Sequence, residues 1–430
     1  DLAALDEPAL RRLRGGGIAY VFQDPASALN PFLTVGTQLA EVARLHLGLG
    51  RAGARQRAAE RLAAVGLAAG VDWLARYPHE LSGGQAQRVA IAMALMGAPE
   101  ILVADEPTTA LDVTVQKGVL ELIRRLADEE GLAAILVSHD IAAVAHVADE
   151  VVVMHGGRVA EAGPVDRLLR RPAAAYTRAL IEATPRLTDP LPPPRPAGVP
   201  LLAVERLRVT YAARGLMRRA QGHVAVRDVS LEIGARETLG LVGESGSGKS
   251  TVARALLGLS PVTSGRVLWR GTPLGAMGPG AARAYRRSVQ MVFQDPYAAL
   301  NPRMVVRRLV AEPLWTHRPD LGRRETNARV AAALEAVRLP AAFAARLPRQ
   351  LSGGQAQRVN IARAIVSEPE LLVCDEAVSA LDVSVQAEIL ELLERLRDEM
   401  GLAMLFITHD LAVVRRMADR IAVMRAGEIV

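Results

Sequence analysis

Cysteine and aromatic residues are scarce in this chain of 430 residues. Its one cysteine, Cys374, excludes an internal disulfide and any zinc or iron–sulfur site built from several cysteines of the chain. Aromatic residues make up 3% of the sequence, too few for the stacking platforms that bind single-stranded nucleic acids. No apolar run reaches 18 residues without a charge, and the first residues lack the basic and apolar regions of a signal peptide.

Lysine is nearly missing as well. Of the 52 basic residues, only Lys117 and Lys249 are lysines, and the arginine pairs are scattered along the chain without forming a basic block. A net charge of +6 is small for this length, so the basic balance does not predict nucleic-acid binding. Composition indicates a soluble, intracellular α/β protein with more than one domain.

A long internal repeat determines the predicted domain organisation. The nine residues from Leu81 to Val89 recur without change from Leu351 to Val359, which is 270 positions later. Asp105-Glu106 recurs as Asp375-Glu376 with the same spacing, and Phe22–Pro25 recurs as Phe293–Pro296. A period of this length is too long for a solenoid, so the chain is predicted to hold two copies of one domain.

The predicted boundary between the copies is rich in proline. Seven prolines lie between Pro185 and Pro200, where they prevent a helix and favour an extended spacer. We therefore expect a first domain at residues 1–184, a linker at 185–200 and a second domain at 201–430.

Apolar runs alternate with helical patterns in both copies. Residues 101–104, 133–137, 371–374 and 403–407 are expected to be buried parallel strands. Residues 115–127 and 385–397 between them have helical periodicity, so each copy is predicted to be an α/β domain with a parallel sheet. Residues 34–77 and 305–347 are rich in Ala, Arg and Leu, which predicts a helical insert in each copy.

The second copy contains a phosphate-binding motif. Gly243-Glu-Ser-Gly-Ser-Gly-Lys249-Ser250 fits G-x-x-x-x-G-K-[ST], follows an apolar strand and precedes a helical run. Its glycines allow backbone N–H groups to surround phosphates at a helix N-terminus. Lys249 is expected to reach the β- and γ-phosphates, and the Ser250 hydroxyl to bind Mg²⁺. A plain Gly/Ser turn before a helix is the alternative reading, and the strand–loop–helix context disfavours it.

Two acidic residues follow the strand at 371–374. Asp375 is expected to hold Mg²⁺, and Glu376 to orient or deprotonate the attacking water. Taken alone, paired acids after a strand could equally form a solvated helix cap. Their repetition at Asp105 and Glu106, and their position after the motif in the second copy, favour the catalytic reading.

At this point the sequence resembles the ATP-binding cassette family. Leu-Ser-Gly-Gly-Gln, present at 81–85 and again at 351–355, is similar to the signature sequence of that family, and the likeness covers almost the whole chain twice. The resemblance implies two P-loop NTPase domains of RecA-like α/β fold. Each would carry a helical subdomain between a loop containing Gln23 or Gln294 and the signature.

The resemblance also implies a set of site residues. Gln294 would sense Mg²⁺ and contact a membrane partner, His409 would touch the γ-phosphate, and Tyr211 would stack on adenine. Tyr211 could alternatively be a core aromatic at a strand end, and a lone His before Asp is often structural. The implied catalytic residues are Glu376, His409, Gln294, Glu106 and His139; the nucleotide-binding residues are Tyr211, Gly243, Glu244, Ser245, Gly246, Ser247, Gly248, Lys249, Ser250, Thr251, Ser82, Gly83, Gly84, Gln85, Ser352, Gly353, Gly354 and Gln355; the metal-binding residues are Ser250, Gln294 and Asp375.

The first copy has no counterpart of Lys249 in this chain, because the matching position falls before Asp1. We expect the chain to be a fragment that lacks the first P-loop and the C-terminal tail of the second copy; a naturally degenerate first site is the alternative. In the family, cassettes pair head to tail, and ATP with Mg²⁺ lies between one P-loop and the opposite signature. One complete site would then join the P-loop at 243–251 to Ser82–Gln85.

Three segments resemble the peptide and nickel importer subfamily. They are Phe-Gln-Asp-Pro-x-x-Ala-Leu-Asn-Pro in both copies, the sequence from Gly240 to Thr251, and the sequence from Pro172 to Leu180. This resemblance implies an ATP hydrolase that powers transport of a small peptide, nickel or glutathione-like solute. Its partners would be two transmembrane permease subunits and an extracytoplasmic solute-binding protein. It would lie peripherally on the cytoplasmic face of the bacterial inner membrane.

A two-cassette ATPase acting on ribosomes or nucleic acid is the competing class. Such proteins often join their cassettes by a long charged helical linker, and the short proline-rich segment here disfavours that reading. An exporter subunit or a regulatory ATPase subunit is a third possibility. The identity of the solute cannot be read from the sequence.

Overall fold

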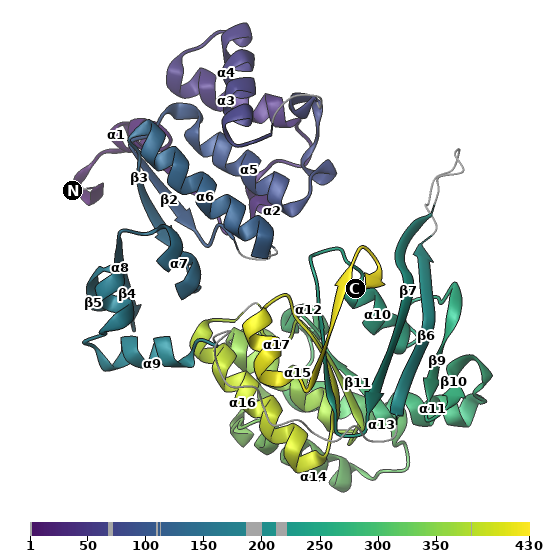
Figure 1. Cartoon of the computed structure of the whole chain (residues 1–430). Helices are drawn as coiled ribbons and strands as arrows, with labels where there is room; N and C mark the ends of the chain where they lie inside the picture. The colour runs from purple at the N-terminus through teal and green to yellow at the C-terminus, as the bar shows by residue number, and fades with distance from the viewer. Residues whose placement is uncertain are drawn as a thin grey trace. The chain divides into compact units, whose positions relative to one another are not determined.

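The computed structural model describes residues 2–67, 72–108, 111, 113–185, 200–211, 222–379 and 381–430. The chain divides into two units, Asp1–Glu182 and Ala183–Val430, each with its own core. The proline-rich segment predicted as a linker lies almost entirely outside the described residues. Figure 1 shows the elements of both units. Among the described helices, none is both long enough and apolar enough to cross a membrane.

A parallel sheet of three strands, in the order β1-β2-β3, lies at the centre of the first unit. A separate antiparallel pair, β4 and β5, follows it (Figure 1). The strands are β1 (Ile18–Val21), β2 (Ile101–Asp105), β3 (Ala133–Val137), β4 (Glu150–His155) and β5 (Arg158–Pro164). The helices are η1 (Leu2–Ala4), α1 (Glu7–Leu13), α2 (Pro25–Ala28), α3 (Val35–Leu47), α4 (Arg51–Ala64), η2 (Trp73–Ala75), η3 (Pro78–Glu80), α5 (Gly83–Ala94), η4 (Leu95–Gly97), α6 (Val113–Glu130), α7 (Ile141–Val147), α8 (Val165–Arg170) and α9 (Ala175–Ala183).

The second unit is built on a ten-stranded sheet in the order β10-β9-β6-β7-β15-β14-β8-β13-β12-β11. Five neighbouring strands, β14-β8-β13-β12-β11, are parallel, while β6 pairs antiparallel with β7 and β9. The strands are β6 (Pro200–Tyr211), β7 (His223–Gly234), β8 (Thr238–Val242), β9 (Ser264–Trp269), β10 (Thr272–Pro273), β11 (Val289–Val292), β12 (Leu371–Asp375), β13 (Ala403–Ile407), β14 (Arg420–Arg425) and β15 (Glu428–Ile429). The helices are α10 (Lys249–Leu256), η5 (Leu274–Ala276), α11 (Pro279–Ser288), α12 (Pro296–Ala299), α13 (Val306–His317), α14 (Arg323–Ala336), η6 (Ala341–Ala345), η7 (Pro348–Gln350), α15 (Gly353–Ile365), α16 (Val383–Met400) and α17 (Leu411–Met417).

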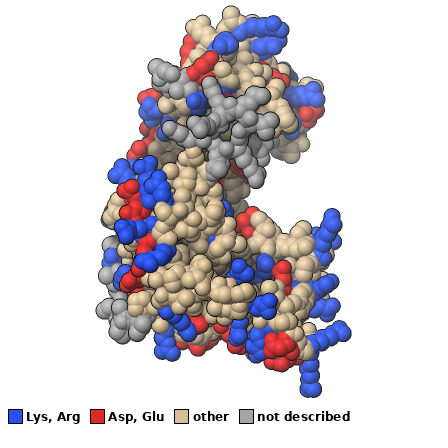
Figure 2. Space-filling view, turned by 90° about the vertical axis from the view of Figure 1, so that its right-hand side faces the viewer, with Lys and Arg blue, Asp and Glu red and all other residues tan. Residues whose placement is uncertain are grey.

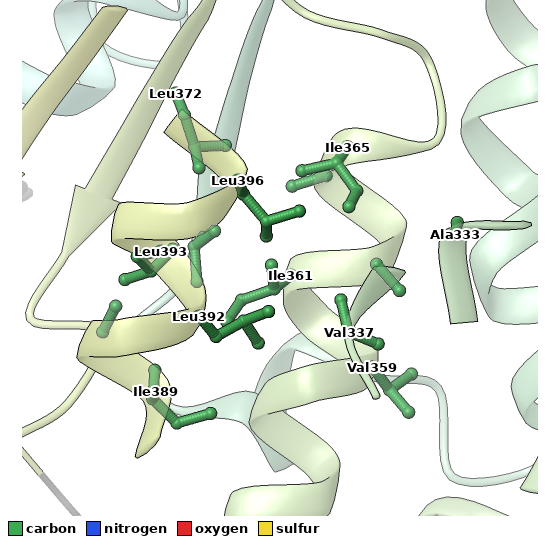
Figure 3. Packing of buried hydrophobic residues seen from close by; sticks show 14 of the residues in the cluster. Ala333, Val337, Val359, Ile361, Ile365, Leu372, Ile389, Leu392, Leu393 and Leu396 are labelled. Carbon is green, nitrogen blue, oxygen red and sulfur yellow. The ribbon is translucent and has the colours of Figure 1, made fainter. Parts of the chain in front are cut away.

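Three neighbouring parallel strands of the second unit, β8, β12 and β13, are buried on both faces. Successive strand residues point to opposite sides, so Leu371 and Val373 join one apolar cluster with α10 while Leu372 and Cys374 join another with α15 and α16. Figure 3 shows the second cluster, where Leu396 and its neighbours on α16 meet side chains of α15. This two-sided packing holds the carboxyl ends of β8, β12 and β13 in fixed register, and the site residues follow those ends.

One predicted burial is wrong. The strand at 133–137 exists as β3, but four of its five residues are exposed, and Ile135 is 54% accessible. Its counterpart β13 is fully buried because it pairs with β12 on one side and with β8 on the other. Among the described residues, β3 pairs only with β2.

Charged side chains are spread widely over the surface. Figure 2 shows basic and acidic residues side by side along much of the face in view. This agrees with the scattered arginine pairs of the sequence, and many arginines pair with nearby acids, as Arg358 does with Glu388 at 2.7 Å.

Candidate functional site: a phosphate loop beside two carboxylates

The loop Gly243–Gly248 joins β8 to α10 in the second unit. Two glycines are required by its geometry. Gly248 has φ +105°, and a Cβ there would lie 2.4 Å from the Ala225 carbonyl oxygen; a Cβ on Gly243 would lie 2.1 Å from the Met424 carbonyl oxygen. Because no side chain fits at either position, the backbone can turn tightly into the helix N-terminus.

Lys249 lies inside this loop and is only 5% exposed. Its Nζ donates to the carbonyl oxygens of Gly243 at 2.6 Å and Glu244 at 2.8 Å, and Ser247 Oγ lies 3.4 Å away. These carbonyl oxygens fix the ammonium inside the loop, where its charge also acts on Asp375 and Glu376. A positive charge held at this position attracts an anion that enters the loop.

The two acids follow β12 as predicted. Asp375 is 4% exposed, and the Ser250 hydroxyl donates to its Oδ1 at 3.1 Å, so the first turn of α10 and the end of β12 meet. Burial raises the pKa of Asp375, while the Ser250 hydrogen bond opposes that shift. The structure therefore places Ser250 beside Asp375, the pair expected to bind Mg²⁺.

Glu376 is held by two partners. Gln294 Nε2 donates to Glu376 Oε2 at 2.7 Å, and His409 Nδ1 lies 3.5 Å from Glu376 Oε1. The contact with His409 lowers the pKa of Glu376, and the same contact raises the pKa of His409. Near neutral pH this keeps a carboxylate at the position expected for activating water.

The first unit repeats this arrangement. Gln23 Nε2 donates to Glu106 Oε2 at 2.6 Å, and His139 Nδ1 lies 3.0 Å from Glu106 Oε1. Glu106 and Glu376 also share left-handed backbone, with φ 44° and 47°. A non-glycine residue adopts that conformation at a cost, so its occurrence at both positions indicates a constraint of the site.

The signature residues begin helices. Ser82 and Ser352 cap α5 and α15, and each forms a capping box with the glutamine three residues later, Gln85 or Gln355. A Cβ on Gly354 would lie 2.4 Å from Val385 Cγ1, so this glycine allows α15 to approach α16 closely. In the first unit, a Cβ on Gly84 would lie 2.5 Å from Val115 Cγ1.

Tyr211 lies apart from these groups, at the end of β6. It is 37% exposed, and its hydroxyl lies 3.0 Å from Ser260 Oγ. The residues that follow it, 212–221, are outside the described part of the chain. Its predicted role in adenine stacking stays a prediction.

Sequence reasoning missed a set of contacts that tie the Gln294 loop to the signature helix. Asn360 Nδ2 donates to the Phe293 carbonyl oxygen at 3.1 Å, and Tyr297 donates to the Leu351 carbonyl oxygen at 2.9 Å. Arg363 Nη1 donates to the Ala299 carbonyl oxygen at 2.8 Å. The sequence held one signal for these contacts. The two copies are identical from Leu81 to Val89 and from Leu351 to Val359, and the next residue is Ala90 in the first copy but Asn360 in the second.

The chain was compared with known proteins. The family model described as ABC transporter matches residues 3–109 and 226–379. The chain belongs to the ABC transporter family. It is therefore an ATPase cassette protein, and the two α/β units correspond to the predicted P-loop NTPase fold.

Relatives of known role match the chain over its full length. It is 44% identical over 456 residues to the glutathione import ATP-binding protein GsiA of Escherichia coli O157:H7, covering 100% of this chain and 73% of that protein. GsiA of Salmonella typhimurium (strain LT2) is 43% identical over 457 residues, with the same coverage of both. Among solved structures, the dimeric bacterial ABC transporter cassette MJ0796 is 30% identical with a TM-score of 0.48, covering 53% of this chain and 96% of that chain.

Proposed function

We propose that the chain is the ATP-hydrolysing subunit of an importer for glutathione or a similar small peptide. The observation that carries this proposal is the meeting of Lys249, Ser250, Asp375 and Glu376 at the carboxyl ends of parallel strands. Ligands of open α/β sheets bind at such ends. The likeness to GsiA supports glutathione over nickel and disfavours a role on ribosomes.

The contacts support the following role for each residue. Backbone N–H groups of the loop and Lys249 bind the β- and γ-phosphates of ATP. Glu376 holds and activates the attacking water, while Gln294 and His409 fix its carboxylate. Catalysis in this arrangement consists of positioning and charge stabilisation.

Mg²⁺ fits the residues present. Asp375 and Ser250 offer two adjacent oxygens, and Gln294, whose amide nitrogen donates to Glu376, would supply its amide oxygen as a third ligand. Within the described residues there is no cluster of three or more His, Cys, Asp and Glu that could hold an ion. Mg²⁺ takes few protein ligands and completes its shell with water and phosphate oxygens. The ion would neutralise charge on the phosphates.

Two lysines allow a matched test of the ATP site. Lys249→Ala should reduce ATP hydrolysis to background, since it removes the buried ammonium of the loop. Lys117→Ala removes the other lysine, which pairs with Glu121 on the exposed face of α6, and should leave hydrolysis unchanged. Equal turnover by wild type and Lys249→Ala would exclude this loop as the hydrolytic site.

Partners and location belong to the same proposal. The subunit would bind two permease subunits, and through them a solute-binding protein, and so lie peripherally at the inner face of the membrane. Cells that lack their own glutathione importer should take up labelled glutathione when they express this chain together with its permease and solute-binding partners. If the cells took up nickel or a dipeptide but no glutathione, glutathione would be excluded as the solute, while the assignment as an ATPase would stand.

A further inference from the structure

A cavity of about 540 Å³ lies on the helical part of the first unit, away from Gln23, Glu106 and His139. Its wall is formed by a face of α3 that runs from its cap Thr34 to Arg44, by the first turns of α4 and by Leu74 of η2. Three arginines contribute to it: Arg44 from α3, and Arg51 and Arg55 from α4. Residues four positions apart on a helix share a face, so the two arginines of α4 point the same way.

Among the residues that the structure describes, no ion pair or hydrogen bond engages the guanidinium group of Arg44, Arg51 or Arg55. Further along α4 the pattern is different, since Arg57 pairs with Glu60 and Arg61 with Glu130. Among the described residues of the wall, Glu41 is the one acidic side chain against three arginines, so these residues carry a net positive charge.

The second unit does not repeat the cluster. Matched by the start of each helix, Arg44 corresponds to Trp315, Arg51 to Arg323 and Arg55 to Asn327. Arg308 lies over the Trp315 ring at 6.0 Å, so that surface is partly aromatic. The Gln–Glu–His contacts are repeated in both units while the arginine cluster is not, so the cluster is not part of the repeated site.

We propose that Arg44, Arg51 and Arg55 form a binding site for a multivalent phosphate group. Guanidinium groups bind phosphate oxygens through paired hydrogen bonds, and three of them from two helices suit a group with several charged oxygens. The phosphate could belong to a free anion such as pyrophosphate or to a phospholipid headgroup, and both present the same chemistry to the cavity.

The test uses the full chain in a Lys249→Ala background, so that the P-loop does not contribute binding. Arg44→Gln/Arg51→Gln/Arg55→Gln is compared with Arg307→Gln/Arg323→Gln/Arg324→Gln, which removes the same charge from α13 and α14 of the second unit. Pyrophosphate is titrated by calorimetry, and sedimentation is measured with vesicles containing phosphatidylglycerol. Circular dichroism establishes that each variant is folded.

We expect binding in one of the two arms to weaken by about tenfold or more in the first triple variant and to persist in the second. A loss seen with pyrophosphate identifies a free anion, and a loss confined to vesicles identifies a lipid headgroup. Equal binding by both triple variants in both arms would overturn the proposal. So would arginine-dependent binding of polyglutamate without binding of pyrophosphate or vesicles, since the site would then recognise carboxylates.

Discussion

Lys249 shows how much a single residue can indicate in this chain. One of two lysines among 52 basic residues, it is also buried within the loop where a compact ammonium fits and a forked guanidinium does not. Lys249→Arg should therefore weaken ATP binding relative to the wild type, even though it keeps the positive charge. Equilibrium binding of a fluorescent ATP analogue measures this, and affinity within about twofold of wild type would contradict the role of size and shape.

Cys374 is expected to be chemically inert. It lies in β12 with no exposed surface, and burial raises the pKa of its thiol to about 12. The thiolate is the reactive form, so a maleimide at pH 8 should label the unfolded chain and leave the native protein unlabelled. Mass spectrometry measures the labelling. Rapid labelling of the native protein would contradict this expectation and show that the β12 region opens.

The pair His409–Glu376 should make stability depend on pH. A raised histidine pKa contributes stability below its ordinary value of 6.5 that is lost as pH rises through the raised value. A lowered glutamate pKa contributes stability above its ordinary value of 4.5 that is lost as pH falls through the lowered value. Both groups are charged between the ordinary pKa of glutamate and the ordinary pKa of histidine. In that pH range His409→Ala should cause its largest loss of stability, about 1 kcal/mol or less. Urea unfolding at several pH values measures it, and a flat profile would contradict the pairing.

At the scale of elements, the signature helices depend on glycine for close packing. Gly354→Ala places a Cβ against the stiff Val385 of α16, and should cost about 1–3 kcal/mol through overpacking. Gly353→Ala is the matched control, because its Cβ would lie 3.6 Å from Leu381, an ordinary contact. Thermal unfolding compares the two variants. Equal stability would mean that α15 and α16 can separate without loss.

The elements themselves were largely predictable from the sequence. The strands at 371–375 and 403–407 and the helix starting near Lys249 follow from apolar runs and from the glycine loop, both local signals. The exposure of β3 was not predictable, because burial of a strand depends on neighbours that pair with it. The link from Asn360 to Phe293 and the left-handed backbone of Glu376 were also missed, since both arise from tertiary packing.

At the scale of the whole molecule, the head-to-tail pairing of cassettes that the family resemblance implies stays a prediction, and cross-linking can test it. In a Cys374→Ser background, Ser82→Cys and Ser245→Cys should then form a disulfide when ATP is added with hydrolysis blocked. Without nucleotide the yield should be low. Gel mobility under non-reducing conditions reports the cross-link, and the same yield with Ser352→Cys in place of Ser82→Cys would reject the head-to-tail pairing.

The central claim is that the P-loop, Asp375 and Glu376 of the second unit hydrolyse ATP, with Glu376 activating the water. The most direct measurement is the amount of unhydrolysed ATP retained by Glu376→Gln after gel filtration with Mg²⁺, compared with Glu399→Gln on the exposed face of α16. The account predicts about one ATP retained per Glu376→Gln chain, no turnover, and wild-type turnover in the control. Turnover by Glu376→Gln at the wild-type rate would contradict it.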